Sequence, residues 1–234
     1  MSGEHLQRIL CACQPAGSVR AMAELLGVAE RTQAQAIALV GDLGTGAGGY
    51  REVFGTLSEA SFPVYWVPGS GDAPADLYLR ESYTIEVAFP LLRGVHGTAA
   101  LAPDTGVVFA GMGGELSDDL DAPRDERERL RYPRWEAAYR LKLLDLLDYN
   151  ELVMLFATAP VHKGRGLPGS EAVAELVGTY RARLVVCGGE RGVELLGSSL
   201  VVAPGVLQDG HYALADLRKR TAELCQLSYA APTG

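Results

Sequence analysis

The sequence predicts an α/β protein, and two observations carry that prediction. Short apolar runs recur along the chain, each closed by Gly, Pro or Asp, which is typical of buried strands. In the first third of the chain these runs alternate with stretches whose apolar residues have helical spacing. Such alternation favours parallel strands joined by right-handed crossover helices.

The first three apolar runs, at residues 8–13, 36–40 and 63–67, are expected to be strands. Ser18 follows the first run and is suited to cap a helix, because its hydroxyl can accept a hydrogen bond from a backbone N–H of the first turn. A Gly-rich turn follows the second run, and a second helix is expected at about 50–60.

Two segments in the rest of the chain depart from this alternation. Residues 118–131 are dense in charges of both signs and are expected to form a solvated loop. The tail at 193–227 is predicted to form several short, mainly antiparallel strands. The other expected elements are strands at 106–110, 152–156 and 184–187 and helices at 133–147 and about 170–179. Since no repeat or Pro/Ser-rich linker interrupts the chain, we expect one domain over 1–234.

Composition excludes several classes of protein. The chain has 234 residues, 48% of them hydrophobic and 21% charged, which is an ordinary globular composition. The net charge of −8 and the lack of a basic stripe argue against nucleic-acid binding. No apolar run is long enough to cross a membrane, and no secretory signal is evident near the start. Four cysteines do not suggest a disulfide framework. We therefore predict a cytoplasmic protein.

Five expected strands end in loops rich in Gly, Pro and Asp. Because ligands of open α/β sheets bind at the carboxyl ends of the strands, we expect these loops to form one site. The residues at the five strand ends are Gln14, Asp42, Ser70, Ala157 and Gly189.

The order of these loops resembles that of the calcineurin-like metallophosphoesterases, over roughly residues 8–205. That family has five blocks, which read D-x-H, G-D, G-N-H-D, a strand ending in His, and G-H-x-H. The matching stretches are 9–17, Val40-Gly41-Asp42, Pro68-Gly69-Ser70-Gly71-Asp72, Leu155-Phe156-Ala157 with Pro160, and Cys187-Gly188-Gly189-Glu190-Arg191. The resemblance implies a four-layer α/β/β/α sandwich of two mixed sheets.

The resemblance also implies a site with two divalent metals, typically Mn, Fe or Zn, that activate a bridging water and hold phosphate oxygens. Of the seven ligand positions that it implies, only Asp42 keeps the family's residue type. The position of the catalytic His is Gly71, although its orienting Asp is present as Asp72. The other six ligand positions carry Gln14, Ala16, Ser70, Ala157, Gly189 and Arg191. Because such losses remove coordinate bonds, we do not expect a two-metal site.

Two functional hypotheses follow. In the first, the protein is a divergent phosphoesterase for a small phosphate ester or diester and uses at most one divalent cation, Mn²⁺, Mg²⁺ or Ca²⁺. In the second, it is an inactive pseudoenzyme that serves as a scaffold or binds a small phosphate-bearing or other anionic ligand. The first hypothesis assigns the metal to Asp42, Gln14 and Glu190, proton transfer to Asp72 and His162, and the substrate to Ser70 and Arg191.

Arg191 has two alternative interpretations that the sequence leaves open. Its guanidinium can bind an anion where the family has a ligand His, or it can form an ion pair with Asp42 that fills the old site. A second group of carboxylates, Glu115, Asp118 and Asp119, follows the run at 106–110. These can bind a cation or act as acids and bases, but a solvated acidic turn is favoured.

Overall fold

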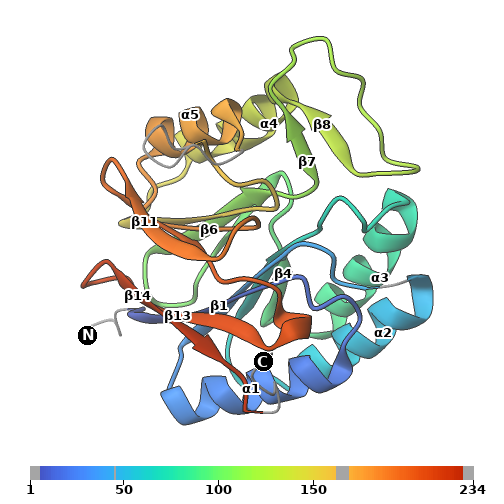
Figure 1. Ribbon diagram of the computed structural model, residues 1–234, viewed down its shortest axis with the longest axis vertical. Helices are drawn as coiled ribbons and strands as arrows, with labels where there is room; N and C mark the ends of the chain where they lie inside the picture. The colour runs from blue at the N-terminus through green and yellow to red at the C-terminus, as the bar shows by residue number, and fades with distance from the viewer. Residues whose placement is uncertain (1–5, 45, 162–168, 229–234) are drawn as a thin grey trace.

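Two six-stranded mixed sheets stack on each other in the computed structural model, and α-helices cover their outer faces (Figure 1). The structure describes residues 6–44, 46–161 and 169–228. This arrangement confirms the α/β class and the sandwich of two sheets. The helices are α1 (Val19–Thr32), α2 (Gly46–Leu57), α3 (Ala75–Ala88), α4 (Arg134–Leu141) and α5 (Glu171–Tyr180), with 3-10 helices η1 (Lys142–Leu146) and η2 (Leu207–Asp209).

The first sheet has the strand order β14-β13-β1-β2-β3-β4. Its strands β1 to β4 run parallel, as the alternation of strands and helices predicts, and the tail adds β13 antiparallel to β1 and β14 antiparallel to β13. The bounds are β1 (Arg8–Cys13), β2 (Ala36–Val40), β3 (Val64–Val67), β4 (Leu92–Gly94), β13 (His211–Asp216) and β14 (Thr221–Gln226).

The second sheet has the order β11-β12-β10-β9-β6-β5. Strands β6, β9, β10 and β12 are parallel, and the two terminal strands β5 and β11 are antiparallel to their neighbours. The bounds are β5 (Thr98–Leu101), β6 (Val107–Met112), β9 (Glu151–Phe156), β10 (Leu184–Cys187), β11 (Gly192–Leu196) and β12 (Ser199–Ala203). A two-stranded ribbon, β7 (Glu115–Ser117) with β8 (Arg131–Pro133), flanks the charged segment.

The inner faces of the two sheets bury one apolar cluster between them. At its centre, Tyr65 of β3 stacks on Phe109 of β6 with ring centroids 3.8 Å apart and planes 8° from parallel. Burial of this kind supplies most of the favourable free energy of folding. No helix in the described ranges combines the length and the apolar content that a membrane crossing requires.

Two helices differ from the sequence-based expectation. Helix α3 is not predicted, because the apolar residues Leu79, Tyr83 and Val87 are all exposed and obscure its amphipathic pattern. The helix expected at 133–147 ends as an α-helix at Leu141 and tightens into the 3-10 turn η1.

The chain crosses between the two sheets at His96, which follows β4 and precedes β5. The Nδ1 atom of His96 accepts a hydrogen bond of 2.9 Å from the N–H of Gly113, so the imidazole holds the exit of β6 against the crossing. Burial, with the nearby charge of Arg140, lowers the pKa of His96 to about 3. The ring is therefore neutral in the folded protein.

Protonation of His96 is expected to destabilise the fold. Its pKa is about 3 in the folded chain, against an ordinary value of 6.5, so the unfolded state binds the proton first as the pH falls. The free energy of unfolding should therefore drop by about 2 kcal/mol between pH 7 and pH 5, as measured by urea unfolding. The His96→Asn variant keeps an acceptor for Gly113, but Asn does not titrate. Its free energy of unfolding should therefore fall clearly less between pH 7 and pH 5. Parallel curves for the two proteins would contradict this account.

Candidate active site

A pocket of about 410 Å³ lies at the carboxyl ends of the central strands. All five strand-end residues expected from the sequence line it, namely Gln14, Asp42, Ser70, Ala157 and Gly189. They come from both sheets, since β1, β2 and β3 belong to the first and β9 and β10 to the second. The two sheets thus meet at this pocket, in the place where a ligand is expected to bind.

The loop after β1 has a constrained backbone. Gln14 and Ala16 both have positive φ, at 52° and 48°, which non-glycine residues rarely adopt. Hydrogen bonds from the Gln14 N–H to the Val40 carbonyl (2.8 Å) and from the Ala16 N–H to the Asp42 carbonyl (2.9 Å) hold this conformation. Such backbone outliers concentrate at functional sites, where surrounding contacts maintain them.

Asp42 lies at the base of the pocket and is wrapped by the loop after β3. The Gly71 N–H donates to its Oδ1 at 2.8 Å, and the Gln14 Nε2 donates to its Oδ2 at 3.4 Å. Gly69 is required for this approach, because a Cβ there would overlap the Asp42 carboxylate and its backbone. Since each carboxylate oxygen has about two acceptor sites, both can accept a further hydrogen bond from a ligand.

Asp72 is fully buried and does not belong to the pocket lining. Its carboxylate accepts hydrogen bonds from the N–H groups of Leu43, Gly44 and Gly69 and from the Tyr50 hydroxyl, the shortest two at 2.7 Å. Burial raises the pKa of Asp72, and these hydrogen bonds act in the opposite direction. Through these hydrogen bonds Asp72 ties the loop after β2 to the loop after β3. Its proposed role in proton transfer requires an exposed atom, which the structure does not provide.

Two predicted residues point away from the pocket. Arg191 donates to the backbone carbonyls of Pro204 (3.3 Å) and Cys225 (3.0 Å), and it is not among the residues that line the pocket. In the described part of the chain it forms no ion pair with Asp42, so that alternative is wrong. Glu190 is exposed and likewise outside the lining, so it does not join Asp42 and Gln14. His162 lies outside the described residues.

Other polar groups that the sequence did not single out complete the pocket. The Thr158 hydroxyl accepts from the Leu116 N–H at 3.1 Å and donates to the Gly114 carbonyl at 3.3 Å. Arg129, from the charged segment, also lines the pocket and pairs with Glu115 at 2.9 Å. No residue pattern in the sequence marks either side chain as part of the site.

Asp118 is exposed, as expected of a solvated turn, and it also caps helix α5. Its carboxylate accepts hydrogen bonds from the Ser170 hydroxyl (2.7 Å), the Ala172 N–H (2.9 Å) and the Glu171 N–H (3.0 Å). Although burial opposes the shift, these hydrogen bonds lower the pKa of Asp118, so it is ionised at neutral pH. The helix dipole is positive at the N-terminus of α5, and this stabilises the negative charge of Asp118.

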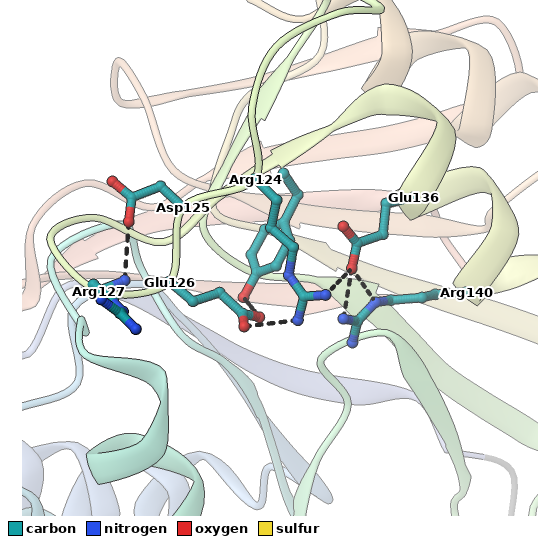
Figure 2. A network of polar contacts seen from close by, with 7 residues as sticks. Arg124, Asp125, Glu126, Arg127, Glu136 and Arg140 are labelled. Atoms are coloured by element: carbon teal, nitrogen blue, oxygen red, sulfur yellow. Dashed lines mark hydrogen bonds and ion pairs between the residues drawn. The ribbon is translucent and has the colours of Figure 1, made fainter.

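The charged segment 118–131 forms a wall of the pocket and is anchored at several points. The Leu130 N–H donates to the Ser70 carbonyl at 3.0 Å, and the Ala75 N–H donates to the Glu126 carbonyl at 2.8 Å. Figure 2 shows a network of polar contacts between side chains of this segment and of α4. Arg124 bridges Glu126 (2.6 Å) and the buried Glu136 (3.8 Å) in that view. Most residues of the segment are exposed and irregular, as expected of a solvated loop, and these contacts also make it part of the site.

Comparison with known proteins agrees with the geometry. Residues 48–227 match the family model described as metallophosphoesterase, calcineurin superfamily. The chain therefore belongs to the calcineurin superfamily of metallophosphoesterases. No protein among those with curated descriptions matches it.

Solved structures show the same fold. TT1561 of Thermus thermophilus is 40% identical over 95% of this chain and 99% of its own, with a TM-score of 0.89. A dimetal phosphatase from Danio rerio is 13% identical over 96% of this chain and 100% of its own, with a TM-score of 0.58. A phosphopantetheinyl hydrolase from Mycobacterium tuberculosis is 14% identical over 99% of both chains, also with a TM-score of 0.58. At such low identity the last two show likeness of fold alone.

The residues of the pocket do not fit the pair of metals that the family implies. Within the described ranges, no three His, Cys, Asp or Glu side chains come together in a way that could hold a metal ion. Gln14 presents its amide nitrogen, a hydrogen-bond donor, to Asp42, and Ala157 and Gly189 have no side-chain donor atoms for a metal. The described residues of the pocket therefore offer no ligand set for a reaction that uses two metals.

Asp72→Asn is expected to lower the free energy of unfolding by about 2–4 kcal/mol. The amide nitrogen of Asn would meet N–H donors that now face a carboxylate, so at least one buried donor would lose its acceptor. Urea unfolding measures this cost. Asp76→Asn is the matched control, because Asp76 is exposed and lies four residues away in the first turn of α3. Equal stability of the two variants would contradict the role of Asp72 as a tie.

Proposed function

We propose that this member of the metallophosphoesterase family binds a small phosphate-bearing ligand in the pocket without the two-metal hydrolysis typical of the family. The observation that carries the proposal is the environment of Asp42, whose two oxygens are hydrogen-bonded by Gly71 and Gln14 where relatives of this type need metal ligands. A carboxylate engaged by protein donors is stable in the pocket without a metal.

Arg129 is the side chain suited to hold the phosphate. Its guanidinium lines the pocket, and its side chain is 55% exposed. Because Glu115 can occupy only part of the five N–H donors of a guanidinium, the rest can bind phosphate oxygens in a bidentate way. Arg129 thus takes the role that the sequence assigned to Arg191.

The acidic groups of the pocket do not prevent an anion from binding. Glu115 is paired with both Arg129 (2.9 Å) and Arg131 (3.3 Å), and Asp118 is engaged by the N-terminus of α5. The charge of Asp42 stays at the base, where Gly71 and Gln14 donate to it. These compensations support binding in a protein whose net charge is −8.

The base of the pocket favours a ligand that also carries hydroxyl groups. Asp42 can accept hydrogen bonds, and Ser70 and Gln14 supply a hydroxyl and an amide beside it. A nucleotide or a sugar phosphate combines such hydroxyls with a phosphate. The volume of about 410 Å³ lies within the usual range for small-ligand pockets.

Hydrolysis at a single-cation site is the second candidate function. Family membership favours it, and Asp42 retains acceptor capacity on both carboxylate oxygens. Calorimetric titration of the metal-stripped protein with Mn²⁺ distinguishes the two. We expect no saturable heat up to millimolar Mn²⁺. Binding of about one equivalent that is lost in Asp42→Asn would overturn our proposal and establish the second candidate.

The ligand itself can be sought with a panel of inorganic phosphate, nucleoside monophosphates and sugar phosphates in a thermal-shift assay. We expect at least one organic phosphate to raise the melting temperature. Arg129→Ala should weaken its binding by about 10- to 100-fold, because a charge-assisted hydrogen bond contributes about 1.5–3 kcal/mol.

Arg127→Ala is the matched control for this experiment. Arg127 is an exposed arginine of the same segment and lies outside the pocket lining, so its removal should leave affinity unchanged. Equal losses in both variants would point to a general charge effect. Failure of the whole panel to bind the wild-type protein would contradict the ligand class.

A further inference from the structure

Large apolar side chains are concentrated on the elements at one edge of the sandwich. Among the described residues, nine of the twelve exposed large hydrophobic side chains lie on α3 and its C-cap, β5, α4, η1 and the residue after η1. They are Leu79, Tyr83, Val87, Phe89, Leu101, Trp135, Tyr139, Leu146 and Leu147. Isolated exposed apolar residues are ordinary, whereas a concentration of this kind marks an interaction surface.

The topology brings these elements to the same place. Strands β4 and β5 are the last strands of their sheets, and the chain passes directly from one to the other. Helix α3 packs along β4, and α4 and η1 pack along β5. This edge is opposite to the one formed by β11 and β14, the other terminal strands of the two sheets. We call it the β4–β5 edge.

Strand β5 has a free side with no charged residue. Its sequence is Thr-Ala-Ala-Leu, and within the described residues it pairs only with β6. Since the Ala102 N–H donates to the Val107 carbonyl, the alternation of antiparallel pairs directs the backbone of Ala100 toward β6 as well. The N–H and C=O groups of Ala99 and Leu101 then point outward. Natural edge strands of this kind are usually protected by charges or covered.

A groove of about 360 Å³ lies beside this strand, between β4 and β5. It is lined by apolar side chains, including Tyr65, Pro90, Leu91 and Leu101, together with Arg93 and polar backbone groups. A second chain that pairs with β5 would set its own apolar side chains over this groove. The surface thus offers both backbone hydrogen bonds and an apolar contact, the combination used in strand addition.

The exposed area is large enough for a specific interface. The four aromatic side chains of the edge, which are between 38% and 74% exposed, present on the order of 500 Å² in total. The five aliphatic side chains extend this toward the roughly 800 Å² that each partner buries in a standard interface. Aromatic residues are also the type most enriched at the centre of interfaces.

We propose that this edge joins two copies of the chain in a symmetric dimer in which the β5 strands pair antiparallel. A two-fold axis at Ala100 sets Ala99 of one copy opposite Leu101 of the other and makes one continuous sheet of the two second sheets. The axis is perpendicular to the sheet, so α4 and η1 of both copies meet on one outer face and α3 of both copies on the other. Each chain has a net charge of −8, which opposes association. Because β5 carries no charged residue, pairing of two β5 strands brings no like charges together.

Sedimentation equilibrium tests the oligomeric state. The wild-type protein is expected to be a dimer at micromolar concentration, and Leu101→Asp should be a monomer, because a carboxylate would be buried next to the axis, opposite Ala99 of the other copy. Leu195→Asp is a closely matched control, since Leu195 is 57% exposed against 60% for Leu101 and lies on β11, the other terminal strand of the same sheet. This variant should remain a dimer.

Cross-linking through Ala100→Cys tests the register without disturbing the contact. Two Ala100 residues on the axis form a non-hydrogen-bonded pair with Cα atoms about 4.5 Å apart, within the range that a disulfide spans. With copper phenanthroline as oxidant, Ala100→Cys should give a reducible band of doubled mass, whereas wild type and Leu195→Cys should not.

Several outcomes would overturn the proposal. A wild-type monomer at 100 µM would exclude the dimer. A dimer that survives Leu101→Asp, with a circular dichroism spectrum like that of wild type, would place the interface elsewhere. Equal dissociation by Leu195→Asp would show that the effect is not specific to this edge. If Leu101→Asp fails to fold, the cross-linking result decides, and absence of the doubled band contradicts the pairing.

Discussion

The buried carboxylate of Asp72 is the contact on which the shape of the pocket depends. It receives hydrogen bonds from the loops after β2 and β3 and from Tyr50 of α2, so it holds together segments that surround Asp42. A buried carboxylate is stable only when donors satisfy it, and here each donor belongs to the backbone or to a buried side chain. This explains why the fold needs the residue, whatever reaction the pocket performs.

The position of the site could be predicted from the sequence because it follows from topology. An apolar run that ends in Gly or Asp marks the carboxyl end of a strand, and parallel strands bring such ends to one side. Gln14, Asp42 and Ser70 therefore meet as expected, and they are joined by residues of the second sheet. The prediction required no knowledge of side-chain direction.

Side-chain direction is where prediction from sequence failed. Arg191 turns to the carbonyl of Cys225, a residue on a strand 34 positions later whose placement no local pattern reveals. Arg129 was missed for the opposite reason, because a charged residue among many charges looks solvated until the Leu130 contact with Ser70 fixes its segment. The positions of both side chains depend on tertiary contacts between distant parts of the chain.

Hydrogen bonds and ion pairs within the protein compensate the carboxylates of the pocket. Where metals would neutralise carboxylates, this chain uses the Gly71 N–H and the Gln14 amide on Asp42 and two arginines on Glu115. The same pocket is independent of the β4–β5 edge, since no described residue of α3, α4, β4 or β5 lines it. Association through that edge would therefore leave one accessible pocket in each copy. Binding and assembly can then vary separately, because they use different elements of the fold.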